Sequence, residues 1–158
     1  MDTPEPARSA RQHLAPGFGV GVTEEMIQAV VHGFYAKIHT DPALGPIFNR
    51  AIVQDAWPAH LQKMCDFWSS VMLMSGRFNG APMPVHLRIE APNREGLNAR
   101  HFARWLHLFG ETVAELCPPE AAGLFVRKSE MIAQSLYLGI AASRGEIPSI
   151  GEVALSRT

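Results

Sequence analysis

Apolar side chains recur every three or four residues along four long stretches of this sequence, and that spacing limits the chain to a helical fold. The first stretch follows Thr23, a residue type that caps helix starts, and the acidic pair Glu24 and Glu25 suits a first helical turn. The apolar positions that predict its buried face are Met26, Ile27, Val30, Val31, Phe34 and Ile38. Alternating strand patterns are nearly absent. We therefore predict an all-α fold.

Prolines separate this first helix from three more. Pro42 and Pro46 interrupt the chain and predict a turn or a single helical turn there. A second long helix is expected to begin near Asp55, and a third over residues 98–116. Pro119, with a proline before it, ends the third helix and predicts the start of a fourth.

Composition narrows the class of protein. The chain has 158 residues, of which 47% are hydrophobic and 18% charged, with a net charge of -1 when histidine is neutral. This balance excludes a disordered chain and a strongly basic nucleic-acid binder, and no apolar run reaches the roughly 18 residues of a membrane span. We predict a flexible leader over 1–22, one helical domain over 23–142 and a loose tail over 143–158.

The cellular compartment and the oligomeric state are inferred from features that the sequence lacks. Cys65 and Cys117 are too few for a disulfide framework and fit a reducing cytoplasm. The first 16 residues have no apolar secretory segment. Because no long apolar stripe is left over, we expect a cytoplasmic monomer.

Motifs for common chemistries are missing, and one long irregular stretch stands out instead. Neither a zinc-ligand spacing, nor a phosphate loop after a strand, nor a nucleophile elbow is present. Residues 75–98 are rich in proline and glycine, and irregular stretches of this length in a compact domain are usually functional. His86 lies within this stretch between apolar residues.

A second histidine, His60, falls on the apolar stripe of the second helix, 26 residues before His86. Tyr35 and Trp105 add two hydrogen-bond donors with large apolar bodies. These residue types suit a flat apolar cofactor with a metal at its centre. Without further context, we would interpret His60 as a histidine at the edge of the core and Tyr35 as a core residue whose hydroxyl is satisfied.

Six motifs in this order resemble the truncated haemoglobins, most closely group III. The resemblance spans roughly residues 24–141 and is specific only when the motifs are taken together. They read GFYAKI at 33–38, DPALGPIF at 41–48, HLQKMCDFW at 60–68, FNG at 78–80 with HL at 86–87, HFARWLHLF at 101–109, and MIAQSL at 131–136.

The resemblance implies a shortened globin fold, a two-over-two helical sandwich around haem b. Position by position, His86 matches the proximal iron ligand, and Tyr35, His60 and Trp105 match the distal residues around a bound ligand. The positions that match haem contacts are Phe48, Met64, Phe67, Trp68 and Leu87. One departure is a link after the proximal histidine that is a few residues longer than usual.

The implied function is binding of O2 and other small ligands such as NO, CO and cyanide. Tyr35 and Trp105 would then carry the chemistry, since hydrogen bonds to charged acceptors contribute about 1.5–3 kcal/mol each. Such tight holding favours NO dioxygenation or a peroxidase-like reaction, supported by an unidentified reductase, over O2 transport. A non-catalytic binder or sensor gated by His60 is the alternative, and a helical module without cofactor is the third.

Two further groups are assigned only a general role. Arg77 and Arg88 are of the type that pairs with haem propionates, because guanidinium matches carboxylate in two-pronged geometry. His101, beside Phe102, is interpreted as a surface residue at the start of a helix.

Overall fold

The helices follow one another in the order that the apolar spacing predicts. The computed structural model describes residues 14–78 and 98–143. These residues contain helices and no strand, and the all-α prediction is confirmed. The elements are η1 (Phe18–Val20), α2 (Glu24–Thr40), α3 (Gly45–Ala51), η2 (Gln54–Ala56), α4 (Trp57–Leu73), α6 (Ala99–Leu116) and α7 (Pro119–Ser143), where η marks a 3-10 helix.

Two helices begin at side chains that cap them. The hydroxyl of Thr23 accepts a hydrogen bond from the backbone N–H of Met26 at 3.1 Å, as the sequence predicts. At α6, the side chain of Asn98 accepts from the backbone of His101, and the His101 ring accepts from the Asn98 N–H. This reciprocal pair satisfies donors that a helix start leaves open.

The turn between α2 and α3 is fixed by one buried carboxylate. Asp41 accepts hydrogen bonds from the backbone N–H groups of Ala43 and Leu44, and Arg104 of α6 donates to the same side chain at 2.7 Å. Burial alone would raise the pKa of Asp41, but these donors and the Arg104 charge outweigh it and hold the pKa below its usual range. The turn is therefore tied to α6.

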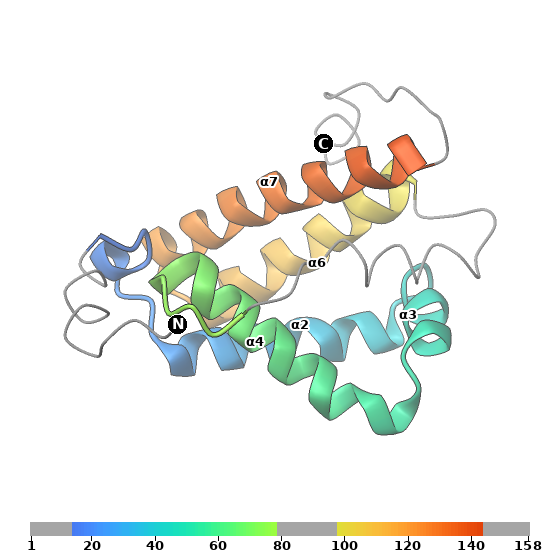
Figure 1. Ribbon diagram of the computed structural model, residues 1–158, viewed down its shortest axis with the longest axis horizontal. Helices are drawn as coiled ribbons and strands as arrows, with labels where there is room; N and C mark the ends of the chain where they lie inside the picture. Colours follow the sequence, from blue (N-terminus) through green and yellow to red (C-terminus); the bar gives the residue numbers. More distant parts are fainter. Residues whose placement is uncertain (1–13, 79–97, 144–158) are drawn as a thin grey trace.

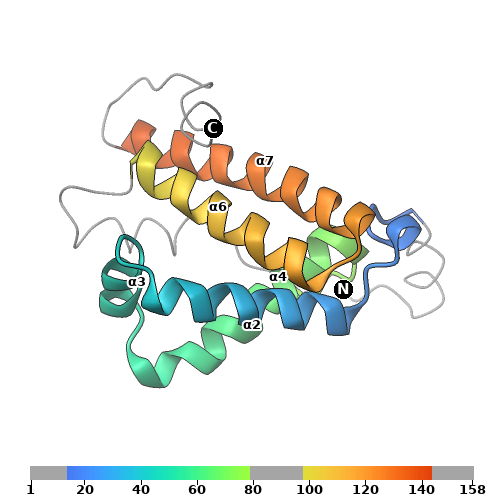
Figure 2. The same cartoon turned by 180° about the vertical axis from the view of Figure 1, so that it is seen from behind.

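The helices pack as two crossed layers. In Figures 1 and 2, α2 and α4 run in opposite directions in one layer, and α6 and α7 do so in the other. The short α3 lies at the end of the molecule where α2 stops, α6 begins and α7 finishes. The predicted two-over-two helical sandwich is confirmed.

Aromatic rings fill the space between the layers. Phe109 of α6 is fully buried and stacks on two tryptophans: Trp68 at 5.0 Å and Trp105 at 5.7 Å between ring centroids. Phe34 of α2 meets Phe109 edge-on at 5.2 Å. Stacked and edge-on rings gain contact energy beyond their buried area, so this stack holds α2, α4 and α6 together.

The segment before α2 joins the core, although the sequence predicts a leader outside it up to residue 22. Ala15 and Val22 are buried. The N–H of Gly17 donates to the carbonyl of Met72, near the end of α4, at 2.8 Å. A side chain at Gly17 would collide with that carbonyl. At least residues 14–22 therefore pack as part of the domain. None of the described helices is long and apolar enough to cross a membrane.

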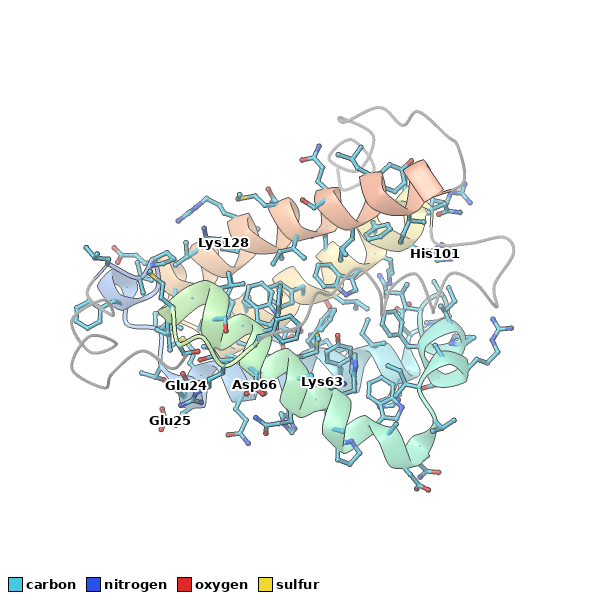
Figure 3. All side chains as sticks on the ribbon, in the orientation of Figure 1. Glu24, Glu25, Lys63, Asp66, His101 and Lys128 are labelled. Atoms are coloured by element: carbon cyan, nitrogen blue, oxygen red, sulfur yellow. The ribbon has the colours of Figure 1, made fainter. Side chains whose placement is uncertain are left out.

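A polar cluster, defined here as Glu24, Ser69, Ser75 and Arg77, joins the start of α2 to the end of α4. The buried hydroxyl of Ser69 donates to the Glu24 carboxylate, and Ser75 Oγ lies 2.7 Å from Ser69 Oγ. Arg77 pairs with Glu24 at 3.2 Å. Glu24 is labelled at the start of α2 in Figure 3. The cluster fixes the direction in which the chain leaves α4.

Candidate functional site

A hollow lies between the helix layers beside the tyrosine of α2. It contains about 430 Å³ of empty space. The side chains around it are apolar or aromatic, and the polar groups among them are the Tyr35 hydroxyl and the indole N–H groups of Trp68 and Trp105. The lining residues are Val31, Phe34, Tyr35, Met64, Phe67, Trp68, Trp105, Phe109, Ile132 and Leu136. The structure thus brings Tyr35, Met64, Phe67, Trp68 and Trp105, all predicted site residues, to one hollow.

A second hollow of about 320 Å³ shares part of this wall. Trp105 and Leu136 line both spaces. The other residues around the second hollow are Leu44, Phe48, His101, Phe102 and Ala133. Phe48, predicted from the resemblance to contact the cofactor, therefore lines this hollow rather than the first.

Tyr35 lies on the buried face of α2, four residues after Val31 and three before Ile38. Its ring meets Phe48 at 6.3 Å and Phe34 at 5.1 Å, both edge-on. Burial raises the pKa of the Tyr35 phenol well above its usual range. The hydroxyl keeps its proton at any physiological pH, so Tyr35 can donate a hydrogen bond to a ligand.

Trp105 is held by rings on two sides. It lies nearly parallel to Phe109, with an interplanar angle of 5°, and meets Phe34 edge-on at 5.3 Å. Its position follows from the three- and four-residue spacing of α6, which puts Trp105 on the same face as Phe102 and Phe109. The indole N–H is a donor only, so it complements an electron-rich ligand atom.

His60 lies in the first turn of α4, next to Tyr35. Their ring centroids are 5.1 Å apart, with the planes nearly perpendicular at 87°. His60 is not among the residues that line either hollow. In the structure His60 thus contacts Tyr35 and lies outside both linings, whereas the resemblance implies direct contact with a bound ligand.

The remaining predicted contacts on α4 differ in how firmly they are packed. Met64 and Trp68 are buried, whereas Phe67 is only partly buried. Phe67 meets Trp68 at 5.9 Å and Phe78 at 5.3 Å, both edge-on. Trp68 also stacks on Phe109 between the helix layers, so the same rings form the aromatic core and the wall of the hollow.

Some predictions concern parts of the chain outside the described residues. His86, the predicted iron ligand, Leu87 and Arg88 all lie there. Arg77 is described, and its guanidinium pairs with Glu24 in the polar cluster rather than standing at either hollow. The suggestion that Arg77 meets a propionate is therefore not supported by its position.

Two residues near the site were assigned no role from the sequence. His101 was interpreted as a surface residue, but the structure gives it a capping role and a place in the wall of the second hollow. Figure 3 places His101 at the start of α6, above α3. The place of Trp57 on the apolar stripe of α4 predicts only core packing, but its ring contacts both Tyr35 and His60. The spacing of Asn98 and His101 is a capping signal that could have drawn attention to His101.

The fold and the hollow define the class of the protein. Two crossed helix pairs enclose an apolar space into which a protonated tyrosine and a tryptophan face, which is the organisation of a truncated globin. No protein-family model matches the sequence.

The sequence and the fold are both similar to a characterised group of these globins. Over 114 residues the chain is 32% identical to the group 3 truncated hemoglobin of Campylobacter jejuni, covering 71% of this chain and 86% of the relative. The crystal structure of the group III truncated hemoglobin from Campylobacter jejuni matches with a TM-score of 0.65 at 30% identity, covering 74% of this chain and 90% of that one. This chain belongs to the group III truncated haemoglobins.

Membership of this family implies haem, and the described side chains fit such a group. A porphyrin is large, flat and mainly apolar, and the two adjoining hollows are lined by aliphatic and aromatic side chains. Phe48, Met64 and Phe67 would hold its apolar surface. The polar donors Tyr35 and Trp105 are few and placed together, as a site for a small ligand requires.

Proposed function

We propose that this protein binds haem b and holds O2 and other small ligands (NO, CO and cyanide) for NO or reactive-oxygen chemistry rather than for O2 transport. The observation that carries the proposal is the pairing of a buried, protonated Tyr35 with Trp105 in one apolar hollow. Two fixed donors in a water-poor space hold a partly negative ligand more tightly than transport requires.

Each part of the proposed mechanism belongs to a named side chain. Haem iron, when bound, supplies the position at which a diatomic ligand is held. His86 would hold the iron of the group through a neutral imidazole nitrogen. Tyr35 donates its phenol proton in a hydrogen bond to the ligand, and the Trp105 indole donates a second. Met64 and Phe67 exclude water from the hollow.

Donation from Tyr35 and Trp105 sets the expected strength of ligand holding. A hydrogen bond to a charged acceptor contributes about 1.5–3 kcal/mol. Two such bonds slow ligand release by about two orders of magnitude or more, since about 1.4 kcal/mol is a factor of ten. Slow release disfavours delivery of O2 and favours its reaction with NO, in which the two oxygen atoms and NO combine as nitrate. In this proposal Tyr35 and Trp105 are the catalytic residues.

A second candidate function is a non-catalytic gas binder or sensor gated by His60. The observation that favours it is the place of His60 beside Tyr35, in a first helical turn that no side chain caps. A small shift of this turn would bring the imidazole towards the hollow or away from it.

Partners and location complete the proposal. Turnover requires a reductase to restore the ferrous state, and the diatomic gases themselves are the ligands. We propose a cytoplasmic monomer, in keeping with the two cysteines. Burial raises the pKa of both thiols, so Cys65 and Cys117 stay protonated and weakly reactive.

Optical spectra test the cofactor and its ligand. The full-length protein, ferric and dithionite-reduced, is compared with His86→Ala after both have been supplied with haem. We expect haem bands in the wild type that collapse or shift to a weakly ligated form in the variant. A wild-type protein that takes up no haem on reconstitution would overturn the proposal. A six-coordinate low-spin ferrous spectrum would favour gating by His60.

Kinetics separate the two candidate functions. Tyr35→Phe should raise the O2 dissociation rate by at least tenfold, because the phenol hydroxyl is lost and the ring is kept. An unchanged rate would remove Tyr35 from the mechanism. Stopped-flow mixing of the oxygenated wild type with NO should give rapid nitrate formation. A sensor would bind NO without forming nitrate.

A further inference from the structure

The start of α4 is weakly held by its own hydrogen bonds. Its N-cap is Ala56, which offers no side chain to the open backbone donors, and Pro58 follows in the first turn. The single turn η2 precedes it, beginning after Val53, which is exposed. His60 lies in this turn. The position of His60 therefore depends on side-chain packing around the turn.

Trp57 packs against this turn from inside the molecule. Trp57, the first residue of α4, is only 7% exposed. Its ring centroid lies 5.7 Å from Tyr35 and 5.5 Å from His60, edge-on in both cases. Since Tyr35 and His60 also touch each other, the three rings form a closed group in which each restrains the other two.

Trp57 is in turn supported from the outer side. The ring of His39, near the end of α2, lies against it with centroids 4.1 Å apart. Asn49 of α3 is 2.7 Å from His39 Nδ1 and donates to the His39 carbonyl at 3.2 Å. The indole is therefore held between the Tyr35–His60 pair and a side chain anchored to α3.

We propose that Trp57 is a positioning residue for the ligand site, acting through Tyr35 and His60. Trp57 lines neither hollow, so it has no direct contact with a ligand there. It fixes the tilt of the Tyr35 ring, and thus the direction of the hydroxyl, and it limits the movement of His60. This inference rests on the proposed function, because it assumes that Tyr35 donates to the ligand.

A double-mutant cycle on the haem-loaded full chain tests the inference. Wild type, Trp57→Leu, Tyr35→Phe and the double variant are compared by O2 dissociation rate and by the C–O stretching frequency of the CO complex. We expect Trp57→Leu to speed O2 release about tenfold and to shift the stretching frequency. In the Tyr35→Phe background the same change should alter release less than about twofold. Equal effects in both backgrounds would overturn the proposal.

Two further variants keep the test decisive. Trp57→Phe shortens the ring and should give a smaller change of the same sign, so it carries the cycle if the leucine variant does not fold. His39→Leu is the matched control: it removes the outer contact but leaves those of Trp57 with Tyr35 and His60. It should change O2 release in the same direction but by less than Trp57→Leu does, because the two inner contacts remain. A change as large as that of Trp57→Leu would mean general loosening and contradict the proposal.

A measurement that needs no ligand separates failure of this inference from failure of the proposed function. Amide hydrogen exchange at residues 60–64, where the intrahelical hydrogen bonds of α4 begin, should accelerate in Trp57→Leu, while exchange in α7 stays as in the wild type. If Tyr35→Phe leaves O2 release unchanged but this exchange accelerates, the proposed role of Tyr35 is wrong and the anchoring by Trp57 stands. Unchanged exchange in this turn would overturn the anchoring itself.

Discussion

The two ends of α2 are joined to α4 by different kinds of contact. At its start, Glu24 reaches Ser69 and Arg77 through directional hydrogen bonds and an ion pair. In its second half, Tyr35 meets Trp57 and His60 edge to face, ring against ring. Hydrogen bonds fix one geometry, whereas ring contacts tolerate small shifts and leave open space beside them. The hollow lies at the aromatic end, where a ligand site can be dry and adjustable.

Among the contacts tested here, the aromatic stack between the helix layers should contribute most to the free energy of unfolding. Phe109→Ala removes the ring between Trp68 and Trp105 from a fully buried position. We expect the free energy of unfolding to fall by about 3–5 kcal/mol, from lost transfer energy and a new cavity. Urea unfolding of the full chain measures it. Phe18→Ala, at an exposed position, should change the value by no more than about 0.5 kcal/mol. Similar losses for both variants would contradict a core centred on Phe109.

The carboxylate at the end of α2 tests whether polar contacts also matter near the hollow. Asp41→Asn removes the charge that Arg104 and two backbone donors satisfy, and should cost about 1.5–3 kcal/mol at neutral pH. The folded protein depresses the pKa of Asp41 below its usual value of 3.8, so this stability is complete above that pH and is lost on acidification through the folded pKa.

Unfolding measured from neutral to strongly acidic pH checks the sign of this effect. The wild type should lose its advantage over Asp41→Asn only as the pH falls below about 4. An advantage that stayed constant down to the lowest pH would mean that the carboxylate charge is not its source.

The sequence predicts this molecule well where the cause is local. Thr23 caps α2, Pro119 begins α7, and the apolar spacing gives each buried helix face, because these signals act within a few residues. Contacts between distant residues leave no such signal. Ser69 donates a hydrogen bond to Glu24, 45 residues away in the chain, and the sequence around either residue does not indicate the other as its partner.

The site was predictable only in part for the same reason. The resemblance supplied Tyr35, Met64, Phe67 and Trp105, and the structure brings all four to one hollow. It could not supply Trp57, because a tryptophan on an apolar stripe looks the same whether it fills the core or orients a neighbour. That distinction depends on where α2 and α4 cross.

The polar cluster should contribute less to the free energy of unfolding than the aromatic stack does. Ser69→Ala removes the hydroxyl that donates to Glu24 and lies beside Ser75, and we expect a loss of about 1 kcal/mol in the free energy of unfolding. In a Glu24→Gln background the loss should shrink, since the charged acceptor is gone. Thermal and urea unfolding of the four proteins give the coupling. A full additive loss would show that Ser69 and Glu24 act independently.

The smallest effect is expected at the outer surface that joins α2 to α6. Lys37 pairs with Glu115 at 2.8 Å and with Glu111 at 3.6 Å, and all three side chains are partly or largely exposed. Lys37→Met should cost about 0.2–1 kcal/mol at low ionic strength and less in high salt. Unfolding in low and high salt tests this. A loss above about 1 kcal/mol that did not shrink in high salt would contradict a screened surface ion pair.

The contact between Gly17 and Met72 decides where this protein can be trimmed. Helix periodicity suggests cutting at residue 23, just before α2. Such a fragment would leave the Met72 carbonyl without its amide partner and uncover the surface beneath Ala15 and Val22. Any shortened version, or any fusion to a carrier at this end, should therefore retain residues 14–22 as part of the folding unit.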